Sequence, residues 1–178
     1  MGKLNIPVIP PEEIAKLELS EFARPRFEQA QQLAPYGLPS NLDSWDGYPA
    51  ARERLFTMLS ADAINPISLA GDTHNGWAFN LTNAQGEPVG VEWGTPGVSS
   101  PGLENYVPLP PEQMQTLLKG ASPELAACDT SRRGWTQVTL TPESATAQWR
   151  FVSSVVEPSY QTSAGPPLVT QRDARSLA

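Results

Sequence analysis

The sequence contains a single cysteine and a single histidine among its 178 residues. One cysteine, Cys128, excludes an intramolecular disulfide framework and every zinc module built from several cysteines. The same scarcity leaves the redox compartment open. Cys128 stands in an alanine-rich stretch, and we expect it to be a small buried side chain.

Basic residues are also scarce, with 12 lysines and arginines against 19 aspartates and glutamates, a formal net charge of −7 and a pI near 4.7. Such a chain lacks the positive surface with which proteins bind nucleic acids or anionic membranes, so we expect neither as a partner. Long apolar runs are absent as well, so we expect neither a membrane-spanning helix nor a signal peptide.

Proline and glycine, by contrast, are plentiful. The 19 prolines and 13 glycines are spread along the chain instead of forming one low-complexity block, which predicts many ordered loops. The length suits a single domain with its own hydrophobic core.

Proline-rich starts and apolar residues at helical spacing predict several helices. We expect them over residues 11–32, with a kink or break at Pro25, and over residues 48–61, 111–120 and 122–127.

Short apolar or alternating runs predict strands. NPISLAG is typical of a buried strand that delivers polar residues at its carboxyl end, where layered α/β folds often carry chemistry. Residues 77–93 and 135–149 each predict a hairpin. The order of elements indicates an α/β or α+β fold whose late strands are mainly antiparallel. After Pro158 we expect a polar, poorly ordered tail.

Asp72 and His74, which follow the NPISLAG run, are the sharpest chemical signal. A carboxylate and a neutral imidazole on one turn can point into one cleft and bind divalent ions. The alternative is that Asp72 caps the turn and His74 is an ordinary loop histidine. The residues of this motif alone favour this alternative.

A second candidate site surrounds the helix start in DSWDGYPAARERL. Trp45 and Tyr48 can form a wall for an organic leaving group, and Arg52 with the helix amino end can hold a phosphate. In the structural alternative, Asp46 is the N-cap, the aromatic side chains form a hydrophobic staple, and the arginines lie on a solvated face. Because capping is so common, the residues alone favour that alternative.

Four blocks taken together resemble a known family: DSWDGYPAARERLFTML, NPISLAGDTHNGWAFNL, VGVEWGTPGVSSPG, and RGWTQVTLTP with AQWRFV. In order and at compatible spacing over about residues 40–157, they resemble the carboxyl-terminal half of the PhoD-like alkaline phosphatases, a branch of the calcineurin-like metallophosphoesterases. The resemblance implies an α/β fold that forms part of a four-layer α/β/β/α metallophosphatase sandwich.

The resemblance also implies a chemistry: hydrolysis of phosphomonoesters and phosphodiesters at a multinuclear metal centre, typically iron with calcium. Asp72 and His74 match the family's late GDxH metal-ligand motif, which favours the ligand interpretation of both residues. Trp45, Tyr48 and Arg52 match the segment that borders the site, and we expect them to contact the phosphoester substrate.

The family's early ligand loops and first strands have no counterpart in this sequence. We therefore expect residues 1–40 to be a helical, family-variable segment, residues 41–157 the carboxyl-terminal part of the phosphatase domain, and residues 158–178 the tail. The expected partner is the missing amino-terminal half or a second copy of the chain.

Too few ligands remain for two metal ions, so we expect negligible hydrolysis by the chain alone. The alternative function is a non-catalytic remnant or binding module that retains the sheet. Members of the family are usually secreted or periplasmic, which does not assign a compartment to this chain.

Overall fold

The computed structural model describes residues 1–39 and 41–178. These residues contain four α-helices, seven β-strands and three short 3-10 helices, labelled η. In chain order they are α1 (Pro11–Ile14), α2 (Ala23–Leu33), η1 (Ala34–Tyr36), η2 (Trp45–Gly47), α3 (Pro49–Asp62), β1 (Ile67–Ala70), β2 (Gly76–Thr82), β3 (Pro88–Gly94), η3 (Leu103–Asn105), α4 (Pro111–Ala121), β4 (Leu125–Asp129), β5 (Arg133–Leu140), β6 (Ser144–Val152) and β7 (Thr162–Gln171).

The strands form two sheets. The first has the order β1-β3-β2-β4, in which β1 runs parallel to β3 and the other neighbours are antiparallel. The second is the antiparallel sheet β5-β6-β7. The predicted mixed α/β architecture with antiparallel late strands is confirmed.

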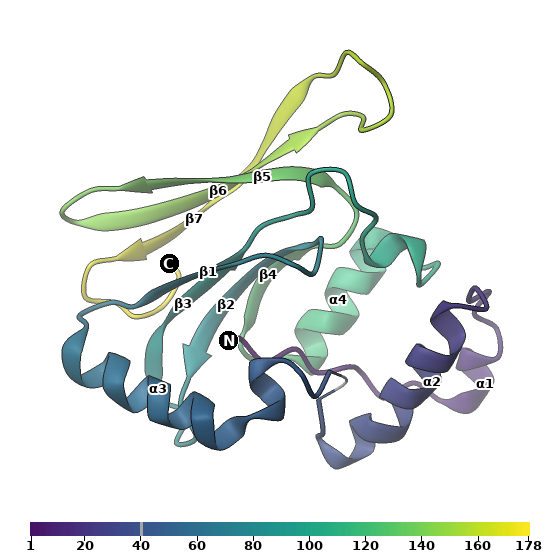
Figure 1. Ribbon diagram of the computed structural model, residues 1–178, viewed down its shortest axis with the longest axis horizontal. Coiled ribbons are helices and arrows are strands. Elements are labelled where there is room, and N and C mark those ends of the chain that lie inside the picture. Colours follow the sequence, from purple (N-terminus) through teal and green to yellow (C-terminus); the bar gives the residue numbers. More distant parts are fainter. Residues whose placement is uncertain (40) are drawn as a thin grey trace.

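Three layers result. Figure 1 shows β5, β6 and β7 lying over one face of the four-stranded sheet, while α2, α3 and α4 lie on the opposite side of that sheet. The described residues thus form a helical layer, a mixed sheet and an antiparallel sheet, in that order.

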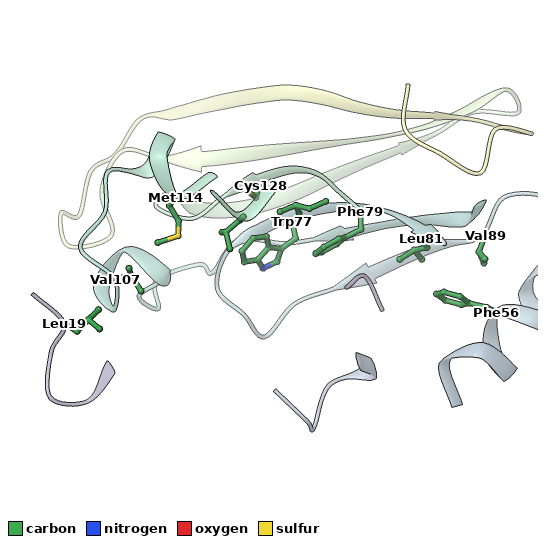
Figure 2. Packing of buried hydrophobic residues seen from close by; sticks show 11 residues of the cluster. Leu19, Phe56, Trp77, Phe79, Leu81, Val89, Val107, Met114 and Cys128 are labelled. Atoms are coloured by element: carbon green, nitrogen blue, oxygen red, sulfur yellow. The ribbon is translucent and has the colours of Figure 1, made fainter. Parts of the chain in front are cut away.

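The helical layer packs on one face of β2 and β3. Because side chains of a strand alternate between faces, Trp77, Phe79 and Leu81 of β2 all point to this side, where Phe56 of α3 and Leu118 of α4 join them. Figure 2 shows Trp77, Phe79 and Leu81 in a row along the sheet, with Phe56 beyond them. This core fixes α3 and α4 beneath the sheet.

The opposite face of the same strands packs against the second sheet. Ala78, Val91 and Trp93 meet Ala147 and Trp149 of β6 there. The Trp149 indole donates a hydrogen bond to the Gly94 carbonyl at 3.1 Å. The two sheets are therefore joined by a buried apolar layer.

The expected helix over residues 122–127 is wrong. Leu125–Asp129 is strand β4, which pairs antiparallel with β2, for example Cys128 opposite Trp77. The helical propensity of the alanines is overridden because this position at the sheet buries Leu125 and Cys128. Burial of Cys128 itself was expected and is confirmed.

The expectation of a poorly ordered tail after Pro158 is also corrected. Residues 162–171 form β7, which places Leu168 opposite Ala147 and the buried Thr170 opposite Ala145. The expectation rested on the polar composition of this segment, but a strand at the edge of a sheet can be largely polar and can contain proline, and β7 lies at such an edge. The second sheet therefore extends past the expected domain boundary at residue 157.

Smaller differences concern the helix starts. The single turn α1 ends at Ile14, and Pro25 lies within the first turn of α2 instead of at a break between helices. Tyr48, not Asp46, occupies the N-cap position of α3 and makes no side-chain cap bond.

Among the helices of the described residues, none has the length and apolarity to cross a membrane.

Candidate metal-ligand turn and the adjoining hollows

The turn between β1 and β2 holds both predicted metal ligands in an unusual backbone conformation. Asp72 has φ +71° and His74 has φ +62°, in the left-handed region that side chains other than glycine seldom adopt. Each such residue costs of order 1–3 kcal/mol and persists where the surrounding structure enforces it, often at functional sites.

The ring of His74 is fixed by a loop that follows β3. Its Nδ1 lies 2.9 Å from the carbonyl oxygen of Pro101. Because a carbonyl only accepts, Nδ1 must carry the proton, and in the neutral ring Nε2 then keeps its lone pair. A histidine that donates one nitrogen to a carbonyl and presents the other is the usual arrangement of a metal ligand.

The backbone of the turn is held from the side of the second sheet. Arg133, a buried residue at the start of β5, donates to the His74 carbonyl at 3.0 Å and pairs with Glu104. The Asn75 side chain accepts the Leu103 amide at 3.0 Å. These contacts restrict the turn from two directions.

Gly102 is needed for this close packing. A Cβ atom there would lie 2.6 Å from both an Arg133 nitrogen and the Asn75 oxygen. The supporting residues Arg133, Asn75 and Gly102 escaped the sequence analysis, because nothing in the motifs around them distinguishes them from ordinary surface and loop residues.

Asp72 lies on the wall of a hollow of about 620 Å³ between the helical layer and the sheet. Trp45 and Tyr48, which precede α3, line the same hollow and are 42% and 55% exposed. The structure thus brings Asp72, Trp45 and Tyr48 together. His74 lies two residues further along the turn and is half-buried. It is not among the described residues that line this hollow.

This hollow is acidic. Besides Asp72, its wall includes Asp43, Asp46 and Glu92. Burial raises the pKa of Asp46, although an amide hydrogen bond from Leu4 opposes the shift. An anionic phosphate would therefore meet a negative field here unless cations neutralise it.

Glu92 was missed by the sequence analysis, although a signal existed. It is a charged residue in the middle of the apolar strand β3, and it is only 5% exposed. Its carboxylate accepts the Ser68 hydroxyl at 3.1 Å and lies against the Met1 amino group. These partners compensate the cost of burying its charge.

Arg52, which we expected to contact the substrate, is not among the residues that line this hollow. Its guanidinium is 5% exposed and donates to both Glu124 oxygens, at 3.0 and 2.9 Å. It also donates to the carbonyls of Met1 at 2.8 Å and Thr82 at 3.1 Å. The face of α3 that carries Phe56 also carries Arg52, so the arginine points at the sheet and is fully engaged there.

A complete metal site is absent from the part of the chain that the structure describes. No group of three or more histidine, cysteine, aspartate or glutamate side chains is placed there to hold an ion. Asp72 and His74 share one turn, and no group of that size among these residues includes them.

Comparison with known proteins adds three findings. The family model of the PhoD-like phosphatases matches residues 14–149. Alkaline phosphatase D of Bacillus subtilis (strain 168) is 30% identical over 142 residues, which cover 77% of this chain and 24% of that protein. A solved structure entitled "Structure of PhoD" superimposes with a TM-score of 0.58 at 27% identity, and the match covers 76% of this chain and 26% of that one. The chain therefore spans about a quarter of the length of these relatives.

Proposed function

The chain belongs to the PhoD-like phosphatase family, and from this premise we propose that it supplies one part of the active site of a metal-dependent phosphoester hydrolase. In this proposal Asp72 and His74 are two of the metal ligands, and Trp45 and Tyr48 border the bound substrate. The observation that carries the proposal is the bond from His74 Nδ1 to the Pro101 carbonyl, since it leaves Nε2 as a lone-pair donor on the turn that also carries Asp72.

The donor types fit the metals that the family implies. Imidazole and carboxylate together suit iron, and the hard carboxylate oxygen also suits calcium. Bound ions would neutralise the phosphoryl oxygens and favour ionisation of the attacking water. Two donors are too few for two ions, so the remaining ligands must come from residues outside the described turn.

The chain's own groups would prepare the site for those ions. The Pro101 carbonyl holds the His74 ring, and Arg133 holds the His74 backbone at 3.0 Å. Trp45 and Tyr48 offer partly exposed aromatic faces to the organic part of a phosphoester. The acidic wall favours cations over a free phosphate.

We further propose that the missing ligands reside in the rest of a phosphatase domain, either within a longer polypeptide or on a partner, which would also supply the other layer of the expected four-layer sandwich. The β1 edge of the first sheet is a suitable place for it to join. Leu69 of β1 is 64% exposed, and β1 already pairs in parallel with β3 on its other side. An edge with an exposed apolar side chain tends to recruit another strand or a second copy of the chain.

A non-catalytic binding module is the second candidate function. It is favoured by the lack of a three-residue metal group in residues 1–39 and 41–178. The two candidates differ in what happens when the remaining ligands are restored.

A chimera tests the proposal. The whole 178-residue chain would replace the matching segment of Bacillus subtilis alkaline phosphatase D, and hydrolysis of bis(4-nitrophenyl) phosphate would be followed with and without added iron and calcium. We expect turnover by the chimera, loss of that turnover on His74→Ala, and negligible turnover by the 178-residue chain alone.

Trp135→Ala is the matched control, because Trp135 is an exposed residue of β5 that lines neither hollow. A folded chimera that is inactive, or that is unaffected by His74→Ala, would favour the binding module.

A further inference from the structure

A second, apolar hollow adjoins the proposed metal-ligand turn. It measures about 880 Å³, which is within the range of small-molecule sites. Its walls come from the amino-terminal segment, α2, the loop after η3, and α4, and they are built largely from aliphatic and aromatic side chains such as Ile9, Phe27, Val107, Met114 and Leu117.

The two hollows meet at the proposed site. Asp72 and Asn41 belong to the walls of both. One hollow is acidic and lined by Trp45 and Tyr48, and the other is apolar. A phosphorus atom held beside Asp72 would therefore have two differently lined spaces within reach of its substituents.

We infer that the apolar hollow binds the hydrocarbon arm, alkyl or aryl, of a phosphodiester substrate, while the acidic aromatic hollow receives the second, polar substituent. This inference rests on the proposed function for the position of the phosphate. A phosphomonoester has one organic substituent and would leave one of the two spaces empty. The adjacency of the hollows therefore favours a diester.

Charge and burial agree with this assignment. Arg26 lies on the wall of the apolar hollow with its guanidinium carbon 4.0 Å from the centre of the Phe22 ring. Its positive charge suits an anionic diester, and Asn41 offers a polar contact at the junction. Phe22 and Leu117 are 59% and 39% exposed, so covering them with a hydrocarbon chain would remove apolar surface from water.

Methyl NMR tests the hollow in the metal-free 178-residue chain. With ¹³C-methyl methionine, Met114 reports on the hollow, while Met58 of α3 is 64% exposed, lines neither hollow and serves as the internal control. Hexan-1-ol is the probe for the hydrocarbon arm, and glycerol is the polar comparison. We expect a saturable shift of the Met114 signal with hexan-1-ol, none of Met58, and none of either with glycerol.

A pair of variants separates binding in the hollow from a general response. Leu117→Lys places a charge on the partly exposed wall without disturbing the buried core, and it should abolish the Met114 shift. Leu140→Lys, at a site that is 70% exposed and lines neither hollow, should leave it unchanged. An unmoved Met114 signal, or equal responses to hexan-1-ol and glycerol, would overturn the inference.

The active chimera then tests the role in the substrate. Hexyl 4-nitrophenyl phosphate should be cleaved with a kcat/KM at least about tenfold higher than methyl 4-nitrophenyl phosphate, since five further methylene groups would be buried. Equal values would overturn the inference. The inference would also be overturned if hexan-1-ol shifted the Met114 signal in the isolated chain but not in the chimera. In that case the rest of the phosphatase would fill the hollow. Failure of the chimera to cleave either ester would count against the proposed function instead, and the Met114 titration would still decide the inference.

Discussion

Replacing Glu124 by glutamine should destabilise the fold severely, because it breaks the buried ion pair that attaches α3 to the sheet. Arg52 and Glu124 are 5% and 8% exposed. The Glu124 carboxylate also accepts the Thr82 amide at 3.0 Å and the Thr82 hydroxyl at 2.6 Å. Leaving the arginine charge buried without its partner costs about 3–5 kcal/mol, which is a large part of the roughly 5–15 kcal/mol that stabilises a typical domain.

Urea denaturation followed by circular dichroism measures this loss. We expect Glu124→Gln to lower the free energy of unfolding by about 3–5 kcal/mol. Glu13→Gln is the matched control, since it removes the surface pair with Lys16, whose side chains are 54% and 67% exposed, and should cost at most about 1 kcal/mol. Equal losses in the two variants would refute the reasoning and would return Arg52 to the list of candidate phosphate ligands.

Three further outcomes are expected. Burial raises the pKa of Asp46 above its ordinary 3.8, so the stability that its protonated form contributes is present below pH 3.8 and is lost as the pH rises through the folded pKa. In urea titrations, Asp46→Asn should therefore be more stable than the wild type at neutral pH, and the difference should vanish in acid. Burial also raises the pKa of Cys128 to about 11, so Ellman's reagent should modify this thiol slowly in the folded chain and rapidly in urea. Gly102→Ala would place Cβ 2.6 Å from the Asn75 oxygen, and ¹⁵N NMR should then show the His74 ring as a mixture of tautomers.

Elements with strong local signals were predictable. The hairpin of β2 and β3 and the hairpin of β5 and β6 show alternating side chains in the sequence, and α3 and α4 begin with prolines and carry apolar residues at helical spacing. In each case the local pattern and the tertiary environment demand the same structure, so one sequence is enough to find them.

Elements defined by partners distant in sequence were not predictable. Strand β4 exists because β2 offers it an edge, and β7 exists because β6 does. Their own residues, AACD and a stretch with two prolines, favour a helix and a loop. Only the sheet context, which a single sequence does not reveal, decides between these states.

In the candidate site, too, residues close together in the sequence were predictable and partners distant in the sequence were not. Asp72 and His74 were found from the GDTH motif, because both belong to one short turn. The partners that orient His74 lie 27 and 59 residues further along, at Pro101 and Arg133, and no spacing rule connects such positions. Arg52 was assigned to the substrate because its segment resembles the family's border region, whereas its place on the inner face of α3 required the structure.

Long-range ¹H–¹⁵N NMR of the single histidine tests the central claim most directly, namely that the turn presents His74 Nε2 and the Asp72 carboxylate as a pair of metal donors. At mildly alkaline pH we predict a neutral ring with the proton on Nδ1, as the 2.9 Å contact with the Pro101 carbonyl requires. Traces of Mn²⁺ should then broaden the Nε2 correlations in the wild type and much less in Asp72→Asn. A ring protonated on Nε2, with correlations that Mn²⁺ leaves sharp in both proteins, would contradict the account.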